Sequence, residues 1–498
     1  MNEKSLNDLK KAYKDYLSKL SISSLRLVGR HSGVSQATLK KKEVLVDDIV
    51  SVLSGEMPPA AKSNRGAPVK DDYVDPKIFE KLQEIKLTYL SGASEEDLEE
   101  SSDLSAVSEN VLEVRSSDFQ EEPVPYHEQE VYSGQLETSN GVSCLVPLSG
   151  REDSSETILV SVSLIKACNL REGDVLCCHV GRQHAALIAT EILSVNGLAV
   201  NASRARFEDS EVKYPDERIF LSAGKEPSAS ARFIDWLIPL GKGQRCLIAG
   251  APKTGKSVLL KDIAVALSEN NPDLRVLVLL VDQSPESVSA FKKAAPGAEF
   301  VCTTFDDEPD RQVFMAEFLL KRAKRFAEMG MDVVLLVDSL SALTRAADET
   351  EMSGTGRNGA GFGPGPDSRT VHFVRRYFGA ARCLEKGGSL TLIGTVSVAT
   401  GNPADDFVAG DLAGISNAEI RLNKELADKR IFPAFDAEAS RTSRSDLLLS
   451  QEELQDEPAV RKYVSAHTDE EVCALVSASE NRARFVKSVA AWMSKDKK

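Results

Sequence analysis

The residues best suited to chemistry lie at positions 250–257 and read Gly-Ala-Pro-Lys-Thr-Gly-Lys-Ser. This segment matches the pattern G-x-x-x-x-G-K-[ST], in which glycines let backbone N–H groups turn toward phosphates. In that pattern Lys256 reaches the β and γ phosphates, and the hydroxyl of Ser257 suits Mg²⁺. The sequence therefore predicts a nucleoside triphosphate site; the alternative is a glycine-rich turn that binds nothing. The predicted nucleotide contacts are Gly250, Ala251, Pro252, Lys253, Thr254, Gly255, Lys256, Ser257 and Val258.

The segments on either side of this loop predict the elements that position it. The apolar run at 246–249 predicts a strand that enters the loop, and the apolar spacing from Val258 to Leu267 predicts a helix that leaves it. The N-terminus of such a helix attracts anions, because its backbone N–H groups are unpaired and its dipole is positive there.

A second candidate for phosphate chemistry is Asp338, which follows the apolar run at 333–337. A carboxylate at the end of a buried strand beside a phosphate loop can hold Mg²⁺, directly or through water. Any buried strand that ends in Asp fits this description, so the motif alone is weak. Together with Ser257 it predicts a metal site.

Hydrolysis also needs a group that orients or deprotonates water. The predicted strand at 275–281 ends in Asp282-Gln283-Ser284-Pro285-Glu286, so Asp282, Gln283 and Glu286 are the candidates. A glutamine amide can position a water molecule, but it cannot accept a proton as a carboxylate does. We expect at least one of the three simply to cap the helix that follows.

The wider pattern predicts an α/β fold. Near-continuous apolar runs at 245–249, 275–281, 299–303, 332–337 and 389–396 indicate strands buried on both faces, hence a parallel sheet covered by helices over 231–450. Short strands and turns over 131–205 predict a small five-stranded barrel, joined by a connector at 206–230. Residues 1–55 and 451–498 have helical patterns, and 56–130 is an acidic segment predicted to be largely disordered.

Composition excludes some functional classes. The chain has 498 residues and a net charge of −15, which argues against a protein that coats nucleic acid electrostatically, although Lys40-Lys41-Lys42 is a local basic cluster. The N-terminal helical segment therefore serves packing or assembly, or binds nucleic acid through these lysines. Eight scattered cysteines predict free thiols rather than zinc ligands. The absence of a long apolar run and of a signal sequence predicts a cytoplasmic protein with no membrane association.

Longer stretches resemble the bacterial transcription termination factor Rho family, RNA-dependent ATPases of the RecA-like ring class. They are Ile-Pro-Leu-Gly-Lys-Gly-Gln-Arg at 238–245, Tyr-Phe-Gly-Ala-Ala-Arg at 377–382 and Lys-Arg-Ile-Phe-Pro-Ala-Phe-Asp at 429–436, with Ala-Pro-Lys inside the phosphate loop. The resemblance extends over about residues 131–454. It implies a RecA-like P-loop NTPase domain preceded by an oligonucleotide-binding, cold-shock-like barrel.

The resemblance also implies ligands and partners. It predicts a homohexamer that passes single-stranded RNA through its centre, binds ATP and Mg²⁺ between subunits, and releases nascent RNA from the RNA polymerase transcription complex. Lys253 would then hold phosphate and Phe432 would stack on adenine. RNA would contact the barrel at Val142 and Cys144, and a central-channel loop at 354–365. The channel-loop candidates are Arg357 and Gly361.

The chain departs from the family pattern at the catalytic positions. Gln283 stands in place of the family's catalytic Glu, and Ser284 in place of an Arg. The Arg that reaches a neighbouring subunit's phosphate falls at Ser443, although Arg441 and Arg444 flank it and can substitute. Because losing a general base typically costs about 10²- to 10⁴-fold in rate, we expect slow hydrolysis.

The RNA-binding positions depart as well. Val142-Ser143-Cys144 replaces the family's Phe-Gly-Phe platform, with Tyr126, Tyr132 or Phe207 as possible substitutes, and Pro403 replaces a channel lysine. Two hypotheses follow: an ATP-driven termination factor, and a nucleotide-binding regulatory scaffold that hydrolyses poorly. A recombinase or an ATP-synthase subunit is disfavoured by the barrel and by the segments at 377–382 and 429–436.

Overall fold

The computed structural model describes residues 10–14, 16–18, 20, 25–26, 28, 34, 40–53, 130–139, 141–150, 157–183, 186–200, 204–224, 226–354 and 366–496. They belong to two compact units, Met1–Pro125 and Tyr126–Lys498, which we describe separately. In the first unit, helix α3 (Lys42–Leu53) packs Leu45 and Ile49 against the buried Tyr13 and Leu17. The predicted helical domain over 1–55 stays a prediction beyond these residues, and the segment predicted to be disordered, 56–130, lies outside the described part apart from its last residue.

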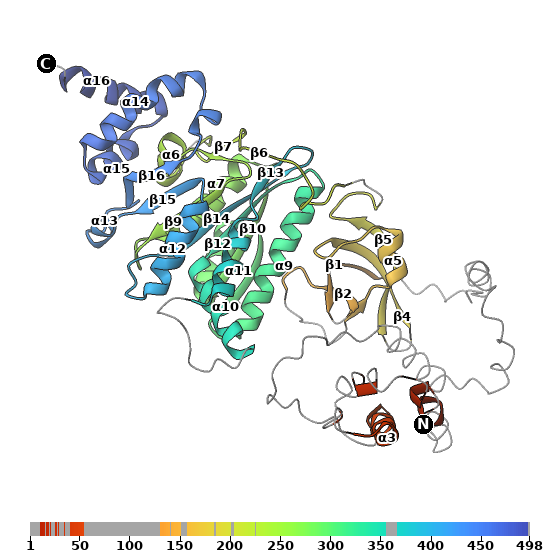
Figure 1. The fold of residues 1–498 in the computed structure, drawn as a ribbon. Helices are drawn as coiled ribbons and strands as arrows, with labels where there is room; N and C mark the ends of the chain where they lie inside the picture. Colours follow the sequence, from red (N-terminus) through yellow and green to blue (C-terminus); the bar gives the residue numbers. More distant parts are fainter. Residues whose placement is uncertain are drawn as a thin grey trace. The chain divides into compact units, whose positions relative to one another are not determined.

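The second unit begins with a closed five-stranded barrel, as the sequence predicts (Figure 1). Its strands pair in the order β1 (Glu130–Ser139), β2 (Val142–Val146), β3 (Ile158–Leu159), β5 (Ala186–Val195) and β4 (Val175–Gln183). The β3–β5 pair is parallel and the others are antiparallel. Helix α5 (Val162–Ala167) starts at Ser161, whose hydroxyl accepts the Leu164 N–H. Apolar side chains fill the barrel, and closure removes the exposed strand edges.

The larger part of this unit is the predicted α/β domain. Its parallel strands lie in the order β11 (Glu299–Thr304), β10 (Arg275–Gln283), β12 (Asp332–Asp338), β14 (Ser389–Ser397) and β9 (Arg245–Gly250). Beyond β9 the sheet continues with parallel β15 (Ala418–Leu422) and antiparallel β16 (Phe435–Thr442). Short strands β13 (Arg382–Leu384) and β6 (Val212–Lys213) extend it beside β14, and β7 (Arg218–Ile219) pairs with β8 (Leu240–Gly241). This is a RecA-like P-loop NTPase domain.

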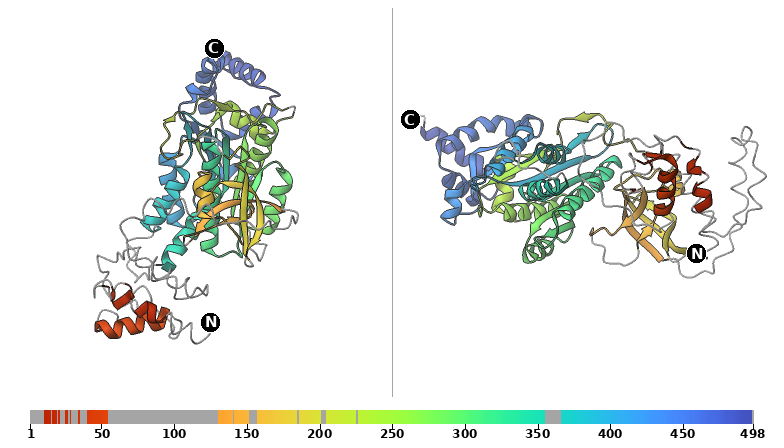
Figure 2. Two further views of the ribbon diagram at one scale, coloured as in Figure 1. Left: turned by 90° about the vertical axis from the view of Figure 1, so that its right-hand side faces the viewer. Right: turned by 60° about the horizontal axis from the view of Figure 1, so that its bottom comes forward.

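Helices cover both faces of the sheet, so its central strands are buried (Figures 1 and 2). One face packs against α6 (Ala229–Leu237), α7 (Lys256–Asn270) and α8 (Pro285–Ala294). The other packs against α9 (Pro309–Glu328), α10 (Leu340–Gly354), α11 (Ser368–Phe378) and α12 (Pro403–Ile415). The short elements α13 (Lys424–Asp428) and η3 (Ser445–Leu447) follow β15 and β16. Helices α14 (Gln451–Ala466), α15 (Asp469–Ala478) and α16 (Arg482–Asp496) gather beside β16.

Buried polar groups join the barrel to helix α9. The side-chain nitrogen of Gln135 on β1 donates to the Phe318 carbonyl at 2.7 Å, and its oxygen accepts from Arg322 Nε at 2.8 Å. Arg322 Nη2 also donates to the Leu148 carbonyl at 2.8 Å, and only 1% of this arginine is exposed. A side chain at Gly173 would place its Cβ 2.7 Å from the backbone of α9, so barrel and helix are in tight contact.

Candidate functional site

The phosphate loop connects the last residue of β9, Gly250, to the first residue of α7, Lys256. Gly255 precedes the helix with φ 96°, a left-handed conformation that glycine adopts without steric cost. Lys253 also has a positive φ, of 65°. These turns bring the loop around the N-terminus of α7, the arrangement that presents backbone N–H groups to an anion.

Lys256 lies inside this loop. Its Nζ donates to the carbonyls of Gly250 at 2.8 Å and Ala251 at 2.9 Å. Burial lowers the pKa of Lys256, and the nearby Asp338 carboxylate opposes that shift. Thr254 stabilises the loop from within, because its buried hydroxyl donates to the Ala251 carbonyl at 2.8 Å. The Lys256 ammonium group is thus held against the loop backbone, and its contact with phosphate stays a prediction.

The predicted metal ligands fit Mg²⁺ by their chemistry. Asp338 ends β12, is 4% exposed, and accepts a hydrogen bond from the Thr395 hydroxyl at 2.7 Å. Ser257 lies in the first turn of α7. Among the described residues, no group of three or more His, Cys, Asp or Glu side chains can hold a metal ion. Mg²⁺ commonly binds through one or two protein groups together with substrate phosphates and water, and Ser257 with Asp338 suits that mode.

Gln283 and Asp282 end β10 but face different surroundings. Gln283 Nε2 donates to the carbonyls of Val281 at 3.3 Å and Asp338 at 3.4 Å, which sets it beside the predicted metal ligand. Asp282 has φ 57°, and its Oδ2 lies 3.8 Å from Arg345 Nη2. It lines a separate acidic cavity of about 290 Å³, bordered also by Asp306, Asp307, Glu308 and Glu349. Gln283, unlike Asp282, therefore contacts the backbone of the predicted metal ligand, and the role of either residue in hydrolysis stays a prediction.

Glu286 lies at the start of the helix that follows β10. It is in the first turn of α8, whose N-cap is Ser284. A backbone N–H and the Ser284 hydroxyl stabilise its ionised form and lower the pKa of Glu286. Ser284 is thus the residue that caps the helix, and Glu286 adds a negative charge where the helix dipole favours one.

A cavity of about 730 Å³ adjoins the phosphate loop. The ring of Phe432, which is 54% exposed, lies 3.6 Å from where a Cβ on Gly255 would sit, so an aromatic face borders the loop. Val258 is 57% exposed and also lines the cavity. The remaining lining includes three residues absent from the sequence prediction: Ser230, Asp262 and Leu422. Asp262 follows Val258 by four positions on α7, a helical spacing that reveals a shared face once the helix is recognised.

The two arginines near Ser443 lie outside this cavity. Arg441 is on β16, and its Nη2 lies 3.6 Å from Glu419 Oε2. Arg444 donates to Asp446 through three contacts, at 3.0, 3.1 and 3.3 Å, and its guanidinium carbon lies 5.4 Å from the centre of the Tyr214 ring. Neither borders the nucleotide pocket of its own chain, so their predicted role toward a neighbouring subunit stays a prediction.

The structure describes some of the residues predicted to contact RNA, and their role stays a prediction. Val142 is 53% exposed on β2 and Cys144, two residues on, is half-buried. Arg357, Gly361 and Tyr126 lie outside the described residues. Pro403 is the first residue of α12, a position where proline fits because the first helical N–H needs no partner.

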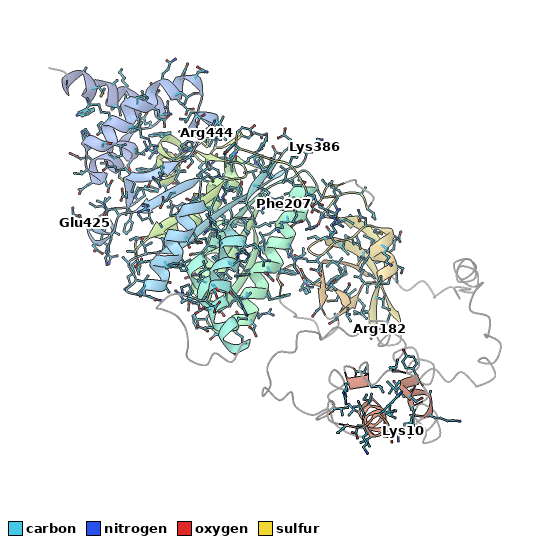
Figure 3. All side chains as sticks on the ribbon, viewed as in Figure 1. Lys10, Arg182, Phe207, Lys386, Glu425 and Arg444 are labelled. Atoms are coloured by element: carbon cyan, nitrogen blue, oxygen red, sulfur yellow. The ribbon has the colours of Figure 1, made fainter. Side chains whose placement is uncertain are left out.

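The expectation that Phe207 substitutes as a stacking residue is wrong. Phe207 lies beside α9 (Figure 3). Its ring is fully buried between Lys324 and Arg382, and its backbone N–H donates to Glu328 at 2.7 Å. Tyr132 packs partly into the barrel core, and burial raises its pKa. Within the described residues, no helix is both long and apolar enough to cross a membrane.

Comparisons with known proteins agree with this architecture. Residues 230–442 match the ATP synthase alpha/beta family, nucleotide-binding domain. The transcription termination factor Rho of Pseudomonas aeruginosa is 36% identical over 335 residues, covering 66% of this chain and 77% of its own. The Rho of Streptomyces coelicolor is 38% identical, with the same two coverages. That of Thermotoga maritima is 36% identical, covering 68% of this chain and 79% of its own. Sheet order, phosphate loop and these relatives together place the chain in the transcription termination factor Rho family.

Proposed function

We propose that this chain is an ATP-hydrolysing transcription termination factor that acts on single-stranded RNA as a homohexamer, with slow turnover. The observation that carries the proposal is the meeting of Lys256, Asp338 and Gln283 at the carboxyl ends of three strands of one sheet, β9, β12 and β10. Ligands of α/β sheets bind at this edge. Membership of the Rho family supports ATP hydrolysis as the reaction and RNA in transcription as its setting.

The side chains at this edge divide the reaction between them. Lys253 and Lys256 hold phosphates, and Ser257 with Asp338 binds Mg²⁺, which neutralises charge developing on the phosphates. Phe432 and Val258 enclose the base. The Gln283 amide nitrogen faces two carbonyls, which can only accept hydrogen bonds, so the amide oxygen is the atom left to orient water. It cannot take the water's proton, and this is the reason for slow turnover. Arg441 or Arg444 would act on the neighbouring subunit's nucleotide.

The test is ATP turnover by the full chain with and without single-stranded RNA, with Lys256→Ala as the control for contaminating ATPase. We expect low basal turnover that RNA raises and that Lys256→Ala removes. Turnover that is equal in both proteins would overturn the proposal.

A regulatory scaffold is the second candidate. Gln283 favours it, and so does the barrel surface at Val142 and Cys144, which lacks the aromatic side chains that stack on bases. It predicts nucleotide-dependent assembly with no RNA-stimulated turnover. Measuring the assembly state by light scattering with ATP and with RNA, in parallel with turnover, separates the two functions.

A further inference from the structure

A second cavity lies at the opposite end of the sheet from the phosphate loop, in the crevice between the barrel and the α/β domain. Its volume is about 400 Å³. The α/β domain contributes the starts of β10 and β11 and one side of α9, and the barrel contributes the start of β4 and the turns that follow β2 and β5. Ligand cavities of roughly 300–1,000 Å³ commonly occupy such junctions. None of the residues that line this cavity borders the nucleotide cavity.

The charged lining of this cavity carries one positive charge in excess. Arg275 and Arg322 both line it, and Glu299 is the one carboxylate among its described lining residues. The two arginines share that carboxylate, because Arg275 Nη1 lies 3.4 Å from its Oε1 and Arg322 Nη1 lies 3.4 Å from its Oε2. Charge-assisted contacts of this kind are ordinarily about 2.7–2.9 Å long, so Glu299 holds neither arginine closely. Glu137, which also acts on Arg322, pairs with Lys321 at 2.6 Å. An anion in the cavity would therefore meet unmatched positive charge.

Arg275 is the arginine that a ligand can reach. Its side chain is 49% exposed, whereas that of Arg322 is 1% exposed. Arg322 is also held on the barrel side, where it donates to the Gln135 amide oxygen and to a backbone carbonyl, each at 2.8 Å. The guanidinium carbon of Arg275 lies 5.5 Å from the centre of the Phe326 ring, a cation–π contact that keeps the group beside the cavity wall. A guanidinium has five N–H donors in a planar fork, so its contact with Glu299 leaves donors for an anionic group.

Apolar side chains form much of the remaining wall. They are Phe326 and Phe300 from the α/β domain and Val175 and Leu148 from the barrel side. Aromatic rings favour a second planar group in offset-stacked or edge-to-face contact. The lining thus suits a ligand that joins a planar apolar body to one negative charge.

We propose that this crevice binds a small organic anion with a planar apolar body, whose charged group pairs with Arg275 and whose rings pack on Phe326 and Phe300. Such a ligand touches the barrel, β10 and β11 together, so its binding stabilises the junction between them. The inference is independent of the proposed ATP site, which lies at the other end of β10.

The test is a fluorescence titration of the full chain with two probes. Anilinonaphthalene sulfonate is an aromatic anion, and phenylnaphthylamine has the same rings without the charge. A hydrogen bond between charged groups supports a large effect, so we expect Arg275→Gln to weaken sulfonate binding roughly 10-fold and to leave the neutral probe unchanged. Ser149→Trp, which fills the cavity from an exposed position on its rim, should weaken both probes.

The matched control is Arg376→Gln. Arg376 is also an exposed arginine beside a phenylalanine ring, 5.9 Å from the centre of Phe373, and it pairs with Glu317 at 2.9 Å, but it lies outside the cavity. Both probes should bind this variant as they bind the native chain. If Ser149→Trp folds poorly, Arg275→Gln decides alone, since its side chain is exposed at the start of a strand.

Three outcomes would overturn the proposal. The first is sulfonate binding that survives Arg275→Gln. The second is displacement of the sulfonate by ADP with Mg²⁺, which would place the probe in the cavity beside the phosphate loop. The third is displacement by a single-stranded RNA oligonucleotide, which would assign the crevice to nucleic acid.

Discussion

The Gln283 side-chain nitrogen lies 3.4 Å from the backbone carbonyl oxygen of Asp338. This contact joins the ends of adjacent parallel strands β10 and β12. It brings the candidate water-orienting group to the candidate metal ligand, although 55 positions separate them in the chain.

Restoring a carboxylate at this contact should raise turnover. In Gln283→Glu the side chain can accept the proton of the attacking water, and general-base catalysis typically contributes about 10²- to 10⁴-fold. We expect ATP turnover to increase by about 10²-fold, measured as phosphate release with RNA present. Gln451→Glu, which changes the same functional group at an exposed helix start, is the control. Unchanged turnover in a variant that still binds ATP would show that Gln283 does not limit the reaction.

Removing the ring of Phe432 should weaken nucleotide binding. Stacking of a base on an aromatic side chain is worth about 1–3 kcal/mol, so Phe432→Ala should raise the Kd for ATP roughly 5- to 150-fold. The control is Phe314→Ala, another exposed phenylalanine, which stacks on Phe318 in α9. Equal weakening by both changes would point to general destabilisation rather than to lost stacking.

Rebuilding an aromatic platform on β2 should strengthen RNA binding. We expect Val142→Phe with Cys144→Phe to lower the Kd for single-stranded RNA roughly 10-fold, by the same stacking energy. Stacking releases no counterions, so the slope of log K against log salt should stay unchanged while the affinity rises. Val162→Phe, at an exposed site on α5, should have no effect. A changed salt slope would mean that the RNA is held elsewhere.

Breaking the contact between barrel and α9 should destabilise the second unit. Burial lowers the pKa of Arg322, and Glu299 opposes the shift, so this charge depends on its partners. Arg322→Leu leaves Gln135 and the Leu148 carbonyl without their donor, which should cost about 3–5 kcal/mol and lower the Tm. Arg376→Leu removes an exposed pair with Glu317 and should cost about 0–1 kcal/mol. Similar Tm values for both variants would contradict the proposed importance of the junction.

Stability should fall in acid through Glu453. Burial would raise the pKa of this carboxyl, but hydrogen bonds from Arg218 and from the Ser450 N–H lower it below its ordinary value of 4.5. An acid whose pKa is lowered by folding stabilises the protein above its unfolded pKa, and this stabilisation is lost as pH falls through the folded pKa. Thermal melts should therefore show Tm dropping below about pH 4.5, with a shallower drop in Glu453→Gln. If Tm falls with pH equally in the native chain and in Glu453→Gln, Glu453 does not contribute to the loss of stability in acid.

Local sequence was enough to predict which residues meet at the carboxyl edge of the sheet. The phosphate loop, Asp338 and Gln283 each follow an apolar strand directly, and parallel strands bring their carboxyl ends together. Asp262 and Ser230 escaped prediction as lining of the cavity because they lie 32 positions apart on two helices, which only the fold brings together. Phe207 was wrongly assigned for a related reason: burial between Lys324 and Arg382 is a tertiary property that no local pattern displays.

The resemblance predicted Phe432 beside the phosphate loop, and the cavity lining agrees. Arg441 and Arg444 pair with Glu419 and Asp446 and do not line this cavity, so their role toward a neighbouring subunit stays a prediction.

Helix α9 contacts both the barrel and the sheet. It is 20 residues long, and its start follows β11 beside the strand that carries Gln283. Near its end, Arg322 donates to Gln135 of the barrel, and Glu328 accepts from Arg171 of the barrel. A helix of this length spans about 30 Å, and it moves as a rigid element rather than bending as a flexible linker does. A displacement of the barrel would therefore be passed to α9 through these buried contacts and, along the helix, to the sheet edge where β10 and β11 end.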